Sequence, residues 1–105
     1  MRYIVDFRDQ PPLLVCSGDE DRSTQSRRRR ALSRALNATS DVTVDLSQLA
    51  WADASLMLDL MMVARRLRRV GCRMVLRGAQ PQIERLIELV GMHRLAGVLI
   101  EPAPA

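Results

Sequence analysis

The segment from Asp41 to Gly71 limits the possible folds of this 105-residue chain more than any other part of its sequence. Val42, Val44 and Leu46 alternate with polar residues, and this period of two predicts a strand with one buried face. A long stretch with helical spacing follows and ends at Gly71, a residue type that commonly closes helices. A short buried strand that leads into a long helix is typical of an α/β fold.

The start of the predicted helix is marked by Asp53. We expect the strand to end by Ser47 and a tight loop to lead from there to Asp53. The Asp53 carboxylate can accept the unpaired backbone N–H groups of Ser55 and Leu56, so Asp53 is predicted to be the N-cap of the helix. The hydroxyl of Ser55 would then lie at the positive end of a helix, beside a carboxylate. This arrangement favours a switch over an enzyme.

The rest of the chain alternates between strand and helix patterns in the same way. The order β-β-α-β-α-β-α-β implies crossover connections and therefore an α/β fold. We expect a mixed, mostly parallel sheet of about five strands, with an antiparallel strand from the opening hairpin and with helices packed against the sheet. One domain is expected over residues 1–101, followed by a frayed tail over residues 102–105. The further elements are strands over residues 2–8, 13–17, 72–76 and 97–101, a polar turn at Gly18–Asp21, a helix capped by Ser23 or Thr24 that runs to about Leu36, and a helix over residues 82–90.

Composition and charge exclude several classes of protein. The chain is 48% hydrophobic and 27% charged, which is typical of a soluble globular domain. No apolar run reaches the roughly 20 residues that a membrane span requires, since Asp59 interrupts the longest candidate. The first nine residues include acidic side chains where a signal peptide would have its apolar core, so we expect a cytoplasmic protein.

Residues that could hold a metal or perform catalysis do not form a recognisable group. Cys16 and Cys72 are far apart in sequence, and we expect two partly buried reduced thiols rather than a disulfide or a metal site. His93 is the single histidine, so a two-histidine zinc site cannot form. The consecutive carboxylates of Gly18–Asp21 are poorly spaced for converging on one ion. The sequence therefore predicts neither an enzyme nor a cofactor site.

Four short segments, spread in order along nearly the whole chain, carry a resemblance to a known family. They are Gly18–Asp21, Val44–Ser47 with Trp51–Ser55, Arg68–Gly71, and Leu89–Leu95. The second resembles the Asp-Leu-Ser…Asp-Ser-Ser-Gly signature of STAS domains, and within that family the small bacterial anti-sigma factor antagonists. The other three are similar to the family's Gly-x-x-Asp turn, its helix exit and its Leu-x-Gly-Leu-x-x-Leu segment.

The resemblance implies a protein-binding switch in transcription regulation. In the family, the unmodified antagonist binds an anti-sigma kinase of the ATPase fold and releases a sigma factor. Phosphorylation of the serine two residues after the signature aspartate breaks this complex, and a phosphatase restores it. The matching serine here is Ser55, bordered by Asp53 and Asp21. Two residues differ from the signature: Ala54 replaces its first serine, and Leu56 replaces its glycine with a bulky side chain where a kinase would approach.

Helical spacing adds a candidate docking surface. Ser55, Leu58 and Met62 share one side of the predicted helix, while the opposite side forms a core stripe. Exposed Leu58 and Met62 would suit a partner protein, because methionine adapts to irregular contacts. The alternative is that both are core residues. The expected core stripe is Met57, Leu60, Met61, Ala64 and Leu67, and the expected partner-binding residues are Asp21, Asp53, Ala54, Ser55, Leu56, Leu58 and Met62.

Three other functions remain open from the sequence. A constitutive STAS interaction module, such as a subunit of a transport complex, would bind a partner without modification of Ser55. An anion or nucleotide could bind at the helix N-terminus, although Asp53 and Asp21 disfavour this. The run Arg27–Arg30 could contact nucleic acid, but the chain has one Trp, one Tyr and one Phe, so a solvated face or a patch for an acidic protein is favoured. The sequence also leaves a homodimer open.

Overall fold

The predicted order of strands and helices is confirmed. The computed structural model describes residues 4–9, 12–20 and 25–102; Asp21, the two expected helix caps and most of the expected tail lie outside this part. The strands are β1 (Ile4–Asp9), β2 (Pro12–Glu20), β3 (Val42–Ala52), β4 (Met74–Arg77) and β5 (Val98–Glu101). The helices are α1 (Gln25–Leu36), α2 (Ala54–Arg69) and α3 (Pro81–Leu89), with a short 3-10 turn, η2 (Met92–Arg94).

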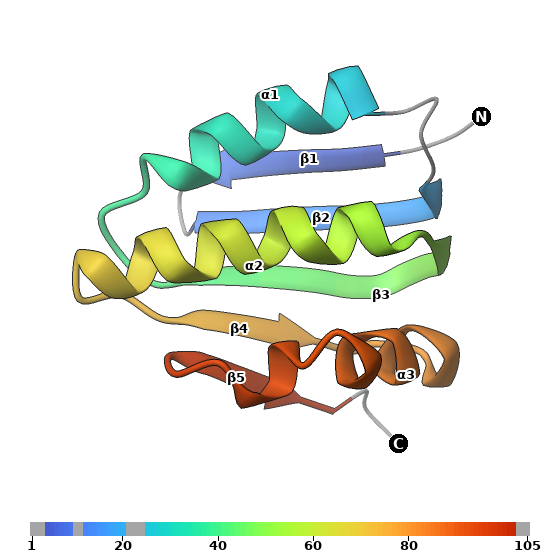
Figure 1. Cartoon of the computed structure of the whole chain (residues 1–105). Coiled ribbons are helices and arrows are strands. Elements are labelled where there is room, and N and C mark those ends of the chain that lie inside the picture. Colours follow the sequence, from blue (N-terminus) through green and yellow to red (C-terminus); the bar gives the residue numbers. More distant parts are fainter. Residues whose placement is uncertain (1–3, 10–11, 21–24, 103–105) are drawn as a thin grey trace.

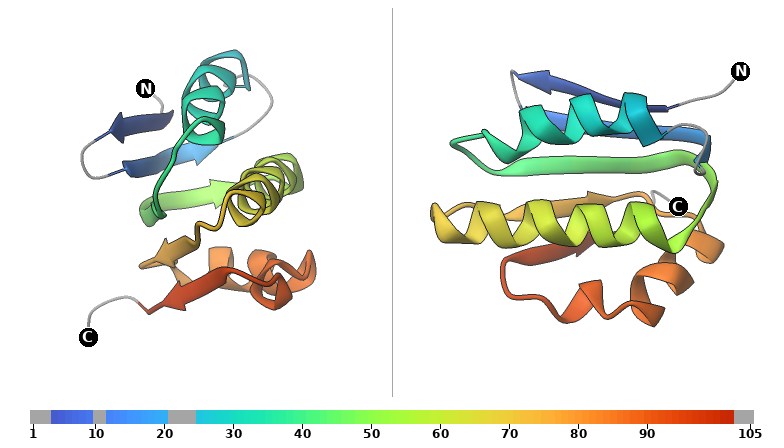
Figure 2. Two further views of the ribbon diagram at one scale, coloured as in Figure 1. Left: turned by 90° about the vertical axis from the view of Figure 1, so that its left-hand side faces the viewer. Right: turned by 45° about the horizontal axis from the view of Figure 1, so that its top comes forward.

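The five strands form one sheet in the order β1-β2-β3-β4-β5. The opening hairpin pairs β1 and β2 antiparallel, and the remaining pairs are parallel. Crossover connections between parallel strands are almost always right-handed, so successive crossovers in one direction place their helices on one face of the sheet. Figures 1 and 2 show α1, α2 and α3 together on that face. The expected α/β fold with a mixed, mostly parallel sheet is therefore confirmed.

The hydrophobic core lies between the sheet and this layer of helices. Val42, Val44 and Leu46 of β3 are fully buried, as their alternation predicts. The predicted core stripe of α2 is confirmed, whereas Leu58 and Met62 on the opposite side of the helix are exposed. The complete buried set of α2 is Leu56, Met57, Leu60, Met61, Val63, Ala64 and Leu67.

Strand β3 is longer than the sequence pattern predicts. It continues past Ser47 to Ala52, so the expected loop before the helix is absent. The register between β2 and β3 shifts at two points, and each shift adds a residue to β3 relative to β2. Such bulges break the alternation of buried and exposed side chains, so the sequence of β3 shows no period of two after Leu46. Likewise, β2 extends to Glu20 through the residues expected to form a polar turn.

Helix α2 begins directly after β3, with Asp53 as the single residue between them. Asp53 has an extended backbone, and its Oδ1 accepts the N–H of Ser55 at 3.1 Å and that of Leu56 at 3.3 Å. The predicted N-cap is therefore confirmed. At the other end, Gly71 has a φ of 80°, the left-handed conformation expected of a helix-closing glycine. Because no loop intervenes, the sheet fixes the position of the first turn of α2.

The two sides of α2 should differ sharply in their tolerance of truncation. Leu60→Ala removes a side chain with 0% exposure and should lower the free energy of unfolding by about 2–5 kcal/mol. Leu58→Ala, in the same helix at 57% exposure, is the matched control and should change it by less than about 0.5 kcal/mol. Urea unfolding followed by circular dichroism measures both values. Similar losses in the two variants would contradict the burial described above.

The N-cap can be tested by comparing two substitutions at Asp53. Asp53→Ala removes the acceptor for the first-turn N–H groups and should cost about 1–2 kcal/mol in the free energy of unfolding. Asp53→Asn keeps a side-chain oxygen at the same place and should cost clearly less. If both variants lose the same stability in urea, the effect comes from charge rather than from capping geometry.

Candidate functional site

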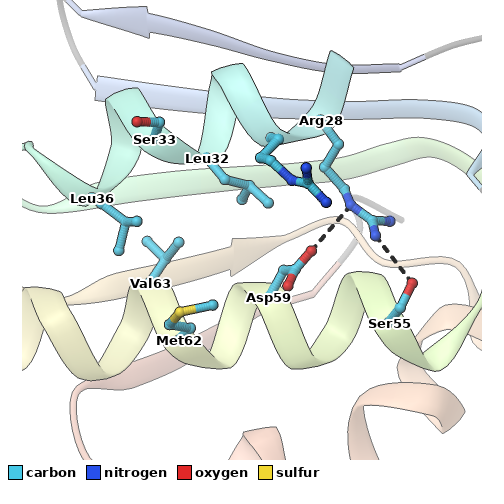
Figure 3. A pocket seen from close by; sticks show the side chains of 9 residues that line it. Arg28, Leu32, Ser33, Leu36, Ser55, Asp59, Met62 and Val63 are labelled. Carbon is cyan, nitrogen blue, oxygen red and sulfur yellow. Dashed lines mark hydrogen bonds and ion pairs between the residues drawn. The ribbon is translucent and has the colours of Figure 1, made fainter. Parts of the chain in front are cut away.

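The hydroxyl of Ser55 lies between a carboxylate and a guanidinium. It donates a hydrogen bond to Asp53 Oδ1 at 2.5 Å, and it accepts one from Arg28 Nη2 at 3.0 Å (Figure 3). Ser55 is half-buried at the second residue of α2. Its rotamer is therefore held by groups from two different elements, the β3–α2 junction and α1.

Arg28 connects α1 to α2 from a buried position. Its side chain is 2% exposed, and its Nε lies 3.2 Å from Asp59 Oδ2 in an ion pair. The planar guanidinium has N–H groups along several edges, so it can bind Ser55 and Asp59 at once. Ser55 and Asp59 are four residues apart and thus neighbours on one face of α2. Figure 3 shows both contacts across the space between the helices.

The sequence reading missed Arg28 because it lies in a run of arginines. That run was expected to form a solvated helix face or a patch for an acidic partner, and for Arg28 this is wrong. A signal was present, since Arg28 precedes Ala31, Leu32 and Ala35 by three, four and seven residues. All three are buried, so Arg28 lies on the apolar side of α1.

These contacts place three groups around the Ser55 hydroxyl that favour addition of a phosphate. The adjacent Asp53 Oδ1 accepts a hydrogen bond from the Ser55 hydroxyl, so this carboxylate is within reach to act as a general base toward it. The first turn of a helix favours an added negative charge. Arg28 provides a guanidinium within reach, the group best suited to pairing with a phosphate. A carboxylate, a helix N-terminus and a guanidinium thus surround one serine hydroxyl.

The described candidate docking residues differ in exposure: Asp53 and Ser55 are half-buried, three others are exposed and Leu56 is buried. Ala54 is exposed, and Leu58 and Met62 are 57% and 53% exposed, so the interpretation of both as core residues is wrong. Leu56 was expected on this surface, but its side chain is fully buried because it lies at the edge of the core-facing side of α2. Leu56 therefore supports the helix from beneath and does not place a bulky group at the surface. Asp21 lies outside the described residues.

Trp51, an exposed aromatic residue near the start of α2, was not identified from the sequence as a candidate site residue. It is 51% exposed and lies one residue before the end of β3. The sequence placed it in a loop, where exposure carries little information. The extension of β3 through two register shifts now places it on a rigid strand.

A groove of about 490 Å³ lies between the outer surfaces of α1 and α2 beside Ser55. One end is polar, with the Arg28, Ser55 and Asp59 cluster described above. The rest is largely apolar, and Figure 3 shows Leu36 and Val63 directed toward each other across it. The lining residues are Arg28, Arg29, Leu32, Ser33, Leu36, Ser55, Asp59, Met62 and Val63.

The other candidate chemical groups lie apart from this site. Cys16 and Cys72 are buried, and His93 is exposed on η2. Within residues 4–9, 12–20 and 25–102, no three His, Cys, Asp or Glu side chains gather closely enough to hold a metal ion. None of the helices in that same part of the chain combines the length and apolarity needed to cross a membrane.

Comparison with known proteins bears directly on the family. No curated protein matches the chain. Residues 4–101, however, match the family described as "Mlab, STAS domain". This span extends from the first residue of β1 to the last residue of β5, and it includes all four segments that resemble STAS signatures. The chain therefore belongs to the STAS domain family.

Proposed function

We propose that this protein is an anti-sigma factor antagonist, a STAS module that binds a partner protein through the outer face of α2 and is controlled at Ser55. The family supports a STAS-type protein-interaction module in general. One observation carries the finer proposal: a serine hydroxyl hydrogen-bonded to Asp53 lies on the same helix face as exposed Leu58 and Met62. Regulation and docking would thus share one surface.

A phosphate on Ser55 would act on this surface directly. It would add a charge of about −1.5 to −2 at neutral pH. The esterified oxygen could no longer donate to Asp53, and the phosphate would compete with Asp59 for Arg28. The helix dipole would favour the phosphate by up to about 1 kcal/mol, so α2 should remain intact. Partner binding would instead be weakened, because the phosphate and Asp53 would repel each other on the docking surface and the added charge would have to lose its water.

The partners in this proposal follow the family cycle. An anti-sigma kinase of the ATPase fold would bind the unmodified protein and phosphorylate Ser55, and a phosphatase would reverse this in the cytoplasm. Ala54 is small and exposed and the Leu56 side chain is buried, so neither of these two residues places a bulky group on the outer surface of the first turn of α2. This geometry supports close approach by a kinase.

A second candidate is a constitutive interaction module within a larger complex. The specific observation in its favour is that the Ser55 hydroxyl already joins α1 to α2 through Arg28. In this case Ser55 would keep the docking surface in shape and would never be modified.

Substitutions at Ser55 distinguish the two candidates. Ser55→Asp should keep a native circular dichroism spectrum but lose a partner that the wild type captures from lysate, because it adds charge to the docking surface. Ser55→Ala should keep the partner. Ser40→Asp is the matched control, since it adds the same charge to an exposed serine in the loop before β3 and should leave binding unchanged. Mass spectrometry identifies the partner and any phosphate on Ser55.

The identity of the captured protein decides between the proposals. A kinase of the ATPase fold, together with phosphorylated Ser55, supports the antagonist function. A transporter ATPase or a membrane complex, captured by a wild type whose Ser55 carries no phosphate, supports the constitutive module. A folded Ser55→Asp variant that still binds an anti-sigma kinase contradicts the switch.

The docking face itself can be tested without reference to phosphorylation. Leu58→Asp should weaken partner binding at least about tenfold, since it places an unpaired charge in an apolar contact. Leu99→Asp, at a residue of β5 that is 46% exposed, is the control and should bind normally. Isothermal titration calorimetry with the purified partner gives both affinities. Equal effects of the two substitutions would place the interface elsewhere.

A further inference from the structure

The groove between α1 and α2 is longer than the hollow beside Ser55 alone. A second hollow of about 330 Å³ is lined by Ser33, Leu36, Asn37 and Arg66. It shares Ser33 and Leu36 with the first, so the two hollows adjoin, and together they make up the depression along the helix pair. From Ser55 to Arg66 this depression follows α2 for about 16 Å, which is roughly three turns of a bound helix.

The floor of the depression is apolar. Leu32 and Leu36 come from α1, and Met62 and Val63 come from α2. Leu32 and Val63 are buried, Leu36 is half-buried and Met62 is exposed, so apolar surface remains accessible along the groove. A floor of this kind suits the apolar side of an amphipathic helix, whose anchors recur every three or four residues.

The sides of the depression are basic. Arg29 of α1 and Arg66 of α2 are both exposed lining residues, and exposed Arg65 and Arg69 extend the charge along the outer face of α2. Asp59 is the one carboxylate among the described lining residues, and it is already paired with Arg28. The groove therefore presents net positive charge around an apolar floor.

We propose that this groove binds an acidic amphipathic helix of a partner protein. Leu32, Leu36 and Met62 contact its apolar side, while Arg29 and Arg66 pair with Asp or Glu side chains along its edges. Complementary charge of this kind directs association and fixes orientation. The inference rests on the proposed function, which places a protein partner on α2, and it adds the chemistry of the segment that the partner contributes.

Two other anionic occupants fit the groove less well. Single-stranded nucleic acid binds through aromatic side chains that stack on bases, and the described lining residues include none. A membrane surface requires apolar side chains that project outward, whereas Leu32 and Val63 lie buried at the bottom of a concavity. Both become outcomes of the test below.

The test uses two fluorescein-labelled helical peptides of about three to four turns. In one, leucines spaced three and four residues apart are combined with glutamates; in the other, lysines replace every glutamate. Fluorescence anisotropy measures their binding to the wild type, to the double variant Arg29→Glu/Arg66→Glu, and to the control Arg94→Glu. Arg94 is an exposed arginine on η2, away from the groove, so the control matches the type of charge change.

The acidic peptide should bind the wild type, and its affinity should fall as salt rises. The double variant should weaken this binding about tenfold or more, whereas Arg94→Glu should stay within about twofold. Leu36→Ser, with its fold checked by circular dichroism, should also weaken it. Equal binding of the lysine peptide, equal effects of the control, or no binding of the acidic peptide at about 1 mM would overturn the proposal.

The same protein is also mixed with phosphatidylglycerol vesicles and with a single-stranded RNA. Tighter binding to either, lost in the double variant, would assign the groove to that ligand and overturn the peptide proposal. The peptide assay does not involve Ser55 modification or a captured partner. Failure of the groove proposal therefore leaves the Ser55 experiments intact, and loss of the Ser55 switch leaves the peptide result intact.

Discussion

The arrangement of the helical layer depends on the contacts that the buried guanidinium of Arg28 makes between α1 and α2. A charged group taken out of water is costly unless it is paired, so Arg28 must remain close to Asp59 and Ser55. This requirement sets α1 against α2 at one end of the groove. Asp53 fixes the start of α2 relative to the sheet, because it caps the helix directly at the end of β3. Sheet, cap and cross-helix ion pair together determine where the Ser55 hydroxyl lies.

Much of the fold could be predicted from periodicity and helix signals alone. Three predictions depend only on interactions between residues close in sequence, and each is confirmed. They are the alternation in β3, the N-cap Asp53 and the helix-closing Gly71. The length of β3 could not be predicted, because its two register shifts depend on pairing with β2 rather than on its own sequence. The pairing of Arg28 could not be predicted for a similar reason, although helical spacing does place Arg28 on the apolar side of α1. Its partner Asp59 lies 31 residues away, and only tertiary packing brings the two together.

The candidate site, too, was predicted correctly where the helical repeat was used. Exposure of Leu58 and Met62 follows from the helical repeat of α2 and was predicted correctly. Leu56 was misplaced because its position was taken from the family signature, whereas it precedes buried Leu60 by four residues and so lies on the core-facing side of α2. Its burial leaves Ala54, Leu58 and Met62 as the exposed residues of the candidate docking face, which lies beside the groove and its arginines. In the proposed account, Ser55 controls one end of a surface whose length provides affinity.

The central claim is that phosphorylation of Ser55 alters this surface without altering the fold. The most direct measurement compares ¹H–¹⁵N NMR spectra of the unmodified protein and of protein with phosphoserine incorporated at residue 55. The account predicts shifts confined to the first turns of α2 and to the Arg28 Nε–H group, with the amides of β3 up to Leu46 unchanged. Widespread shifts or lost dispersion throughout the sheet would contradict it, because the phosphate would then be disrupting the structure rather than the docking face.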